Sequence, residues 1–543
     1  MTTDNFFPRR RFEITLLRDP LRRPAARFAA SALSGFLLFA CFPLLSWHFL
    51  VWVACAPLLA ALLREPRLGR AFLLGYTAGA IYLVGSCYWF VFVMQRYGGM
   101  GPVLAFGALV LFVVVVSAFF GAFGLVEGWV ARGSEVWALL LSPFLWVAME
   151  IARTYLITGF PWNLLGYAVQ ATGLRQVASF TAVYGLSFLG AATSAWLAWL
   201  WLRPRQKSAW AMLASWCALL VAANWALTPA VPGPGTRPVC LVQPNIPMDV
   251  DSVVKWAPWR DPAPLEGLVA MSVASVAGGG KSGAPPLIVW PENPAPFYFG
   301  RDPIFRSAVE RMARQAHAYV IVGSVNYADQ ENTQPKNSAI VLDPEGRVLL
   351  MYDKIHLVPF GEYVPTWAFP GLVGKITYEA GNFVPGTSYH TARAQDGAIG
   401  VFICYEAIFP QLVRRLVPDG PGVLVNISND AWFGDSAAAF QHLEMARLRA
   451  IENRRFLLRA TNDGITAVID PYGRVITRLP RHQLAVLIGQ FDYRAGRTFY
   501  TIHGDVFAWF CVLIAGAIAA TKIKRQKTRV ESKNGEPRAM DNE

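Results

Sequence analysis

Long apolar runs separated by short basic loops constrain this chain more than any other feature of its 543 residues. A helix that crosses the hydrocarbon core of a bilayer needs about 20 largely apolar residues. Seven candidate runs occupy residues 1–228, and an eighth lies near the C-terminal end. They are Phe28–Leu45, Leu50–Leu63, Ala71–Met94, Pro102–Val126, Val136–Ile151, Val177–Leu202, Trp210–Leu227 and Asp505–Thr521. The second run is short, which fits a tilted or incomplete span.

Composition agrees with a membrane protein. Hydrophobic residues make up 54% of the chain and charged residues only 16%, whereas soluble domains contain about 25% charged residues. A purely soluble protein is therefore disfavoured, and disordered and collagen-like chains are excluded. The seven cysteines form no CxxC pair or Cys/His cluster, so we expect neither a metal site nor a cofactor.

The positions of lysine and arginine predict the orientation of the spans. Cytoplasmic loops carry an excess of these residues. The basic segments are residues 1–27, 64–70, 203–207 and 522–529, with Arg132 between them, while the alternate loops hold only Arg96, Arg153 and Arg175. This pattern predicts cytoplasmic termini, eight spans, and a region from about Thr228 to Gly504 on the far side. The net charge of +13 is then a topology signal and no nucleic-acid surface is expected.

Two features near the predicted span ends have more than one interpretation. Glu127 and Glu150 lie close to span ends, where an interfacial position would be enough to solvate a carboxylate. Trp162 lies in the segment Gly159–Asn163 after the fifth run. It fits either an aromatic belt at the membrane surface or a re-entrant segment beneath an extramembrane domain.

The composition changes at residues 229–235, a stretch rich in proline and glycine that resembles a linker. Beyond it, short β-rich runs alternate with helical patterns, which predicts an α/β or α+β layered domain. The expected helices are Asp302–His317 and Ser436–Arg454. The expected strands are Pro238–Val242, Leu287–Trp290, Tyr319–Ser324, Ser338–Leu342, Val348–Tyr352, Gly400–Cys404, Val423–Ile427, Phe456–Ala460, Thr466–Ile469 and Leu484–Gly489. The similar segments Asp343–Val348 and Asp470–Val475 have the residues of type I turns and predict two hairpins.

Reactive side chains lie at the ends of three of these strands. Glu292 follows the strand Leu287–Trp290, and Cys404 ends the strand Gly400–Cys404. Lys354 and Glu362 follow the strand Val348–Tyr352. A carboxylate, an ammonium and a thiol can together deprotonate the thiol, attack an acyl carbon and stabilise the oxyanion. The residues alone leave other interpretations open, since Cys404 could be a core residue and Lys354 a surface charge.

At these positions the chain resembles a known family. WPEN at 290–293, YDKIHLVPFGEYVP at 352–365 and ICYE at 403–406 are similar to the Glu-Lys-Cys motifs of the nitrilase superfamily. With spans on both sides of that domain, nearly the whole chain resembles the bacterial apolipoprotein N-acyltransferases. Further matching segments are VQPNIP at 242–247, ISNDAWFG at 427–434, QHLEMARLRAIE at 441–452 and LLRATNDG at 457–464.

The resemblance implies roles for individual residues. Glu292 would be the general base, Lys354 the oxyanion-stabilising cation and Cys404 the nucleophile. The supporting residues that we expect are Glu362, Tyr405, Glu406, Trp256, Asn429 and Trp432, with Trp259 as an alternative to Trp256. His356 and His442 are expected to be structural. Met248 and Asn293-Pro294 depart from the family pattern and place details of substrate contact in doubt.

The resemblance also implies an architecture and a reaction. The expected fold is a polytopic α-helical membrane protein with a periplasmic αββα nitrilase-like sandwich, in a bacterial inner membrane. The expected parts are a membrane domain at 1–228, a catalytic domain at 229–503, a transmembrane helix at 504–521 and a cytoplasmic tail at 522–543. An acyl chain would pass from a phospholipid, typically phosphatidylethanolamine, through a Cys404 thioester to the α-amine of a diacylglyceryl-modified lipoprotein cysteine. The alternatives are a membrane-anchored hydrolase with the same triad and a catalytically silent lipoprotein-binding factor.

An apolar segment follows Glu362. Between Gly361 and Gly386 it contains Trp367 and several other large apolar residues without a clear period. It fits either a buried core loop or a mobile lid that touches the bilayer and admits acyl chains.

Overall fold

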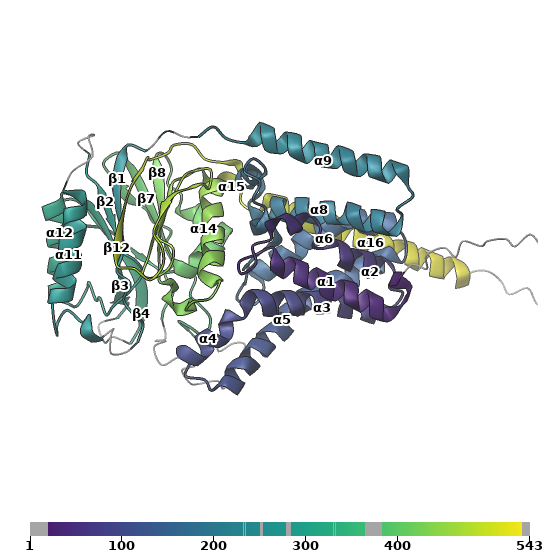
Figure 1. Cartoon of the computed structure of the whole chain (residues 1–543), viewed down its shortest axis with the longest axis horizontal. Coiled ribbons are helices and arrows are strands. Elements are labelled where there is room, and N and C mark those ends of the chain that lie inside the picture. Colours follow the sequence, from purple (N-terminus) through teal and green to yellow (C-terminus); the bar gives the residue numbers. More distant parts are fainter. Residues whose placement is uncertain are drawn as a thin grey trace, which may run out of the picture.

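The computed structural model describes residues 20–231, 233, 235–249, 254–277, 284–329, 331, 333–363 and 383–534. These residues form a helical bundle and a layered α/β domain that lie end to end (Figure 1). The proposed lid residue Trp367 lies outside the described residues.

The bundle contains most of the helices. They are α1 (Pro24–Ala40), α2 (Ala56–Leu63), α3 (Leu68–Cys87), α4 (Trp89–Arg96), α5 (Pro102–Ala131), α6 (Glu135–Tyr155), α7 (Ala178–Thr181), α8 (Val183–Leu202), α9 (Lys207–Leu227), α15 (Phe499–His503) and α16 (Val506–Asn534). Among the described residues, five helices are long and apolar enough to cross a membrane, namely α3, α5, α6, α8 and α9. Three shorter apolar helical segments coincide with the first, second and eighth predicted runs. The chain therefore has a polytopic membrane part, and the count of eight spans stays a prediction.

Three predicted runs are interrupted in the structure. The second consists of a 3₁₀ turn (His48–Trp52) followed by α2. The third divides at Tyr88 into α3 and α4, and the sixth divides at Ala182, whose φ is 53°. Small residues allow α3 and α5 to pack closely, since a Cβ at Gly75 would lie 2.1 Å from the carbonyl oxygen of Phe120. Such close backbone approach is typical of helix pairs in membranes.

The prediction of interfacial positions for Glu127 and Glu150 is wrong. Both side chains are buried inside the bundle. Glu127 accepts a 2.6 Å hydrogen bond from the Ser142 hydroxyl, and Glu150 accepts bonds from Trp146 and from the Leu165 amide. Buried carboxyl groups need such partners, and the predicted run lengths could not reveal that α5 and α6 supply them.

The basic loops assigned to one side of the membrane meet in the structure. Arg27 pairs with Glu65 at 2.9 Å, and Glu135 pairs with both Arg64 and Arg203 at 2.6 Å. Arg175, from the opposite set of loops, pairs at 2.9 Å with Glu444 of the α/β domain. The two sets of loops therefore lie at different ends of the bundle, as the charge pattern requires.

The α/β domain contains two six-stranded sheets packed face to face. One sheet has the order β12-β1-β2-β3-β4-β5 and the other β11-β10-β9-β8-β7-β6. Helices α11 (Ala263–Val276) and α12 (Pro303–Ala316) cover the first sheet, and α14 (Ala438–Asn453) lies between the second sheet and the bundle (Figure 1). The short α13 (Pro410–Val413) follows β7. These layers are the expected αββα sandwich.

The strands follow the predicted runs closely. The first sheet contains β1 (Arg237–Gln243), β2 (Leu287–Val289), β3 (Tyr319–Tyr327), β4 (Pro335–Leu342), β5 (Val348–Asp353) and β12 (Ala485–Phe491). The second contains β6 (Ala392–Ala394), β7 (Gly397–Ile403), β8 (Gly422–Ser428), β9 (Leu457–Thr461), β10 (Ala467–Ile469) and β11 (Val475–Arg478). Both hairpins form, because Gly346 and Gly473 each donate a 2.9 Å bond across a turn closed by Asp343 or Asp470. The strands β6 and β11 and the helices α11, α13 and α15 were not predicted.

Candidate active site

The three reactive residues predicted from the sequence lie where strands of both sheets end. Glu292 comes three residues after β2, Lys354 directly follows β5, and Cys404 directly follows β7. All three side chains are almost fully buried, with exposed fractions of 5%, 1% and 7%. The domain therefore brings two oppositely charged groups and a thiol into one water-poor site.

Two carboxylates, those of Glu292 and Glu362, contact the ammonium of Lys354. The Nζ of Lys354 lies 3.1 Å from Oε1 of Glu292 and 3.0 Å from Oε1 of Glu362. Asn337 on β4 donates 2.8 Å bonds to the same two oxygens. Although burial opposes the charge of Lys354, Glu292 and Glu362 raise its pKa well above the usual value. The ammonium is thus permanently charged.

The backbone at Cys404 adopts a conformation that side chains rarely take. Its φ is 47°, at the point where β7 ends and the 3₁₀ turn Cys404–Ile408 begins. Strain of this kind is common at functional sites, where it fixes the direction of a side chain. Burial and the charge of Glu292 raise the pKa of the thiol, while Lys354 acts in the opposite direction. At rest the sulfur is therefore protonated and needs a base.

Glu406 connects the lysine loop to the cysteine turn. Its carboxylate is fully buried and accepts bonds from the backbone amides of Ile355, at 2.7 Å, and Ile403, also at 2.7 Å. The hydroxyl of Tyr352 donates to both of its oxygens. Burial raises the pKa of Glu406 to about 7. Glu406 therefore holds together the segments that carry Lys354 and Cys404, which agrees with the supporting role expected for it.

Of the other supporting residues that we expected, Asn429 contacts Glu292, whereas the three tryptophans pack elsewhere. The backbone amide of Asn429 donates a 2.9 Å bond to Oε2 of Glu292, and its side chain contacts the sulfur of Met248. Trp432 packs edge-on against Tyr97 of the bundle, with ring centroids 4.5 Å apart. Trp256 packs against the hydrophobic cluster beneath α11 and α12, whereas Trp259 is 53% exposed. Within the described residues, neither tryptophan forms a hydrogen bond with Glu292 or Lys354.

Both histidines occupy structural positions. The ring of His356 lies 3.8 Å from that of Phe409, and burial lowers its pKa to about 4. His442 on α14 is fully buried, with Nδ1 3.0 Å from Asp430 and 3.1 Å from the guanidinium of Arg459. Burial and the charge of Arg459 lower the pKa of His442. Its Nε2 lies 3.1 Å from the carbonyl oxygen of Cys404, to which it donates a hydrogen bond because a carbonyl oxygen can only accept.

The membrane bundle reaches the residues around the cysteine. Trp162 is buried, donates a 2.7 Å bond to Gln441 of α14 and stacks on His442 at 5.9 Å. The hydroxyl of Tyr405 donates to the carbonyl oxygen of Gly159 at 3.3 Å. Of the two interpretations of the Gly159–Asn163 segment, the one beneath the extramembrane domain agrees with this position. The simple aromatic belt does not.

Several polar residues of the site were missed in the sequence. Asn337 lies inside β4, and Arg459 lies inside β9. Arg459 donates a 2.7 Å bond to Asp430 from a fully buried position. The sequence did offer one signal for Arg459, since it is the charged residue in an otherwise uncharged strand. Within the described residues, no group of three or more His, Cys, Asp or Glu side chains could hold a metal ion.

Comparisons with known proteins agree with this division of the chain. A carbon–nitrogen hydrolase family model matches residues 239–499, and an apolipoprotein N-acyltransferase N-terminal domain model matches residues 34–196. Among solved structures, an amidase from Nesterenkonia sp. is similar with 18% identity and a TM-score of 0.35, covering 51% of this chain and 95% of that one. The two family models thus divide the chain into a carbon–nitrogen hydrolase domain and a preceding domain that contains most of the long apolar helices.

Curated relatives define the family more closely. An apolipoprotein N-acyltransferase from Geobacter metallireducens is 38% identical over 93% of this chain and 96% of the relative. One from Methylococcus capsulatus is 33% identical over 90% of this chain and 92% of the relative. The chain belongs to the apolipoprotein N-acyltransferase family.

Proposed function

We propose that the protein transfers a fatty acyl chain from a phospholipid to the α-amine of the diacylglyceryl-modified N-terminal cysteine of lipoproteins. Family membership supports the reaction, since the curated relatives carry this activity in their name. The observation that carries the mechanism is the buried Lys354 ammonium, which lies between Glu292 and Glu362 and acts to lower the pKa of the Cys404 thiol.

Glu292 acts as the general base. The thiol is buried and its pKa is raised, so it reacts only when a neighbouring group accepts its proton. The carboxylate of Glu292 is oriented by Asn337, Lys354 and the amide of Asn429. It takes the thiol proton as the sulfur attacks the ester carbonyl, and returns it to the leaving lysophospholipid oxygen.

Lys354 stabilises the oxyanion of each tetrahedral intermediate. Its ammonium has three N–H donors, and Glu292 and Glu362 accept from two of them. The third is available for the negative oxygen that develops in the transition state, where a preorganised charge acts most strongly. A second attack, by the amine on the Cys404 thioester, then releases the lipoprotein in a ping-pong sequence.

The membrane arrangement supports a periplasmic catalytic domain. The basic loops gather at one end of the bundle, while Arg175 and Trp162 contact the α/β domain at the other. By the positive-inside rule the basic end, with both termini, is cytoplasmic. We assign residues 1–228 to the membrane domain, 229–503 to the catalytic domain, 504–521 to a last transmembrane helix that packs against the membrane domain, and 522–543 to a cytoplasmic tail. In this arrangement both lipid substrates approach within the outer leaflet.

Mass spectrometry of the intact protein tests the proposal. Purified enzyme mixed with phosphatidylethanolamine, without acceptor, should gain the mass of one acyl chain on the peptide that contains Cys404. Addition of a diacylglyceryl lipopeptide should remove the adduct and produce a triacylated peptide. Cys240→Ala should behave as wild type, because Cys240 is a fully buried thiol of β1. Loss of the adduct to water at the same rate with and without acceptor would instead define a hydrolase.

A further inference from the structure

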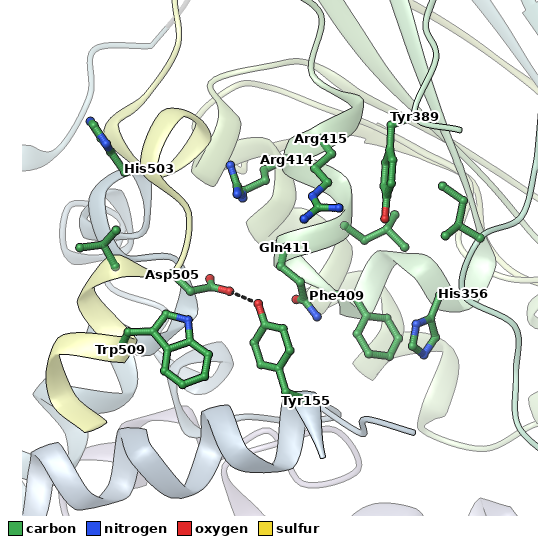
Figure 2. A pocket seen from close by; sticks show the side chains of 13 residues that line it. Tyr155, His356, Tyr389, Phe409, Gln411, Arg414, Arg415, His503, Asp505 and Trp509 are labelled. Carbon is green, nitrogen blue, oxygen red and sulfur yellow. Dashed lines mark hydrogen bonds between the residues drawn. The ribbon is translucent and has the colours of Figure 1, made fainter. Parts of the chain in front are cut away.

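A cavity lies where α6 and α16 meet the catalytic domain (Figure 2). Its volume is about 380 Å³, within the range of pockets that hold small ligands. Neither Glu292, Lys354 nor Cys404 lines it. Ile355 and His356, which follow Lys354, form part of its wall. The cavity therefore adjoins the active site but is separate from it.

Basic side chains are concentrated on one wall of this cavity. Arg414, Arg415 and His503 line it, and Figure 2 shows the two guanidinium groups side by side above Gln411. Arg414 is half-buried and donates a 3.1 Å bond to the carbonyl oxygen of Thr501. Arg415 is exposed, with its guanidinium 5.1 Å from the centre of the Tyr389 ring.

Among the described residues, Arg414 and Arg415 have no acidic partner, whereas some other arginines of the catalytic domain do. Arg497 pairs with Asp419 at 2.8 Å and Arg481 with Asp463 at 3.3 Å. Within the described part of the chain, no carboxylate lies within 4.0 Å of Arg414 or Arg415. The acidic residue of the lining, Asp505, instead accepts bonds from Tyr155 at 2.6 Å and from Tyr500 at 2.9 Å. The cavity thus keeps a surplus of positive charge.

The opposite wall is apolar and belongs to helices at the membrane surface. Val506 and Trp509 lie at the start of α16 and are 51% and 49% exposed. Tyr155 ends α6 and is 44% exposed. Tryptophan and tyrosine favour the headgroup region of a bilayer. A free anion needs no such wall, whereas a ligand with a charged head and an apolar body uses both sides.

We propose that this cavity binds the phosphodiester headgroup of a bilayer glycerophospholipid, separately from the catalytic site. Arg414 and Arg415 bind the phosphate oxygens, a geometry that suits the planar guanidinium. The glycerol and first acyl carbons lie against Val506 and Trp509. The bound lipid stabilises the contact between α16 and the catalytic domain. The inference concerns binding alone and does not depend on the proposed acyl transfer.

Photo-crosslinking of the full-length protein tests this site. The Cys404→Ala variant, in nanodiscs, receives a phosphatidylglycerol with a photoreactive group near its phosphate, so that no acyl transfer can occur. Crosslinked peptides should include residues 409–415 or 503–509. Arg415→Gln should reduce this crosslink several-fold, and Arg414→Gln combined with Arg415→Gln should reduce it about tenfold or more, as expected for lost charge-assisted hydrogen bonds.

Two controls make the result specific. Arg301→Gln removes another exposed arginine that stacks on a tyrosine, with its guanidinium 4.4 Å from the Tyr327 ring, and should leave the crosslink unchanged. An excess of unlabelled phosphatidylglycerol should compete, whereas dioleoylglycerol and inorganic phosphate should not. Crosslinks that avoid both segments, or persist in the double variant, would overturn the proposal. Equal competition by inorganic phosphate would show a site for soluble anions and would overturn it as well.

Discussion

The Nε2 of His442 lies 3.1 Å from the carbonyl oxygen of Cys404, and the ring of Trp162 stacks on the other side of the same imidazole at 5.9 Å. His442 belongs to the catalytic domain, whereas Trp162 belongs to a loop of the membrane bundle. The strained backbone that presents the thiol is therefore supported from within the membrane domain. This contact gives the bundle a part in shaping the active site in addition to its contact with lipid.

Replacement of Trp162 tests that support. Trp162→Phe keeps a stacked ring and loses the hydrogen bond to Gln441, so we expect a loss of about 1 kcal/mol in stability and near-normal turnover. Trp162→Ala opens a cavity, which costs about 3–5 kcal/mol, and should lower kcat even with a short soluble thioester as donor. Single-turnover acylation and thermal unfolding in detergent measure the two effects. Normal kcat in the alanine variant would show that the contact only stabilises the fold.

Cys404→Ala should abolish both acyl transfer and the acyl adduct. The substitution keeps a Cβ at a residue whose φ is 47°, so the backbone strain is unchanged and the protein should insert into the membrane normally. Activity is measured with a diacylglyceryl lipopeptide acceptor, and folding by size-exclusion chromatography and thermal unfolding. Transfer at the wild-type rate by this variant would refute the covalent mechanism.

Lys354→Arg should slow acylation of Cys404 by at least about a hundredfold, the scale of removing one oxyanion donor. The lysine is 1% exposed and lies between two carboxylate oxygens at 3.1 and 3.0 Å. A planar guanidinium keeps the charge but cannot occupy the place of a compact ammonium. Lys336→Arg, at a half-buried lysine paired with Asp353 at 2.8 Å, is the matched control and should retain activity. An unimpaired first half-reaction in Lys354→Arg would assign the lysine a structural role only.

The positions of most strands could be predicted, as could the candidate reactive residues at their ends, because both depend on local pattern. Each predicted strand is an apolar run bounded by turn residues, and Glu292, Lys354 and Cys404 come at or just after the ends of such runs. The strands β6 and β11 were missed because they are short edge strands whose side chains are largely exposed, so that neither forms an apolar run. The contact between Trp162 and Gln441 joins residues 279 positions apart, so no window of the sequence could contain it. The same holds for the burial of Glu127 and Glu150, which depends on how the helices pack.

Asp430→Asn should destabilise the catalytic domain by about 3–5 kcal/mol at neutral pH, because it leaves the guanidinium of Arg459 buried without its counterion. Burial opposes the charge of Asp430, but Arg459 and His442 outweigh it and hold the pKa well below the usual value of 3.8. A carboxyl group whose pKa is lower in the folded state stabilises the fold above its unfolded pKa and loses that contribution as the pH falls. The difference in unfolding free energy between wild type and variant should therefore shrink below a pH of about 3.8.

Chemical unfolding in detergent across this pH range measures that difference. Asp419→Asn is the matched control, because Asp419 is an exposed aspartate that pairs with Arg497 at 2.8 Å. Exposed pairs contribute about 0–1 kcal/mol, so the control should unfold nearly as wild type does. If Asp430→Asn were as stable as this control at neutral pH, the buried network of Asp430, Arg459 and His442 would not be what stabilises the turn that carries Cys404.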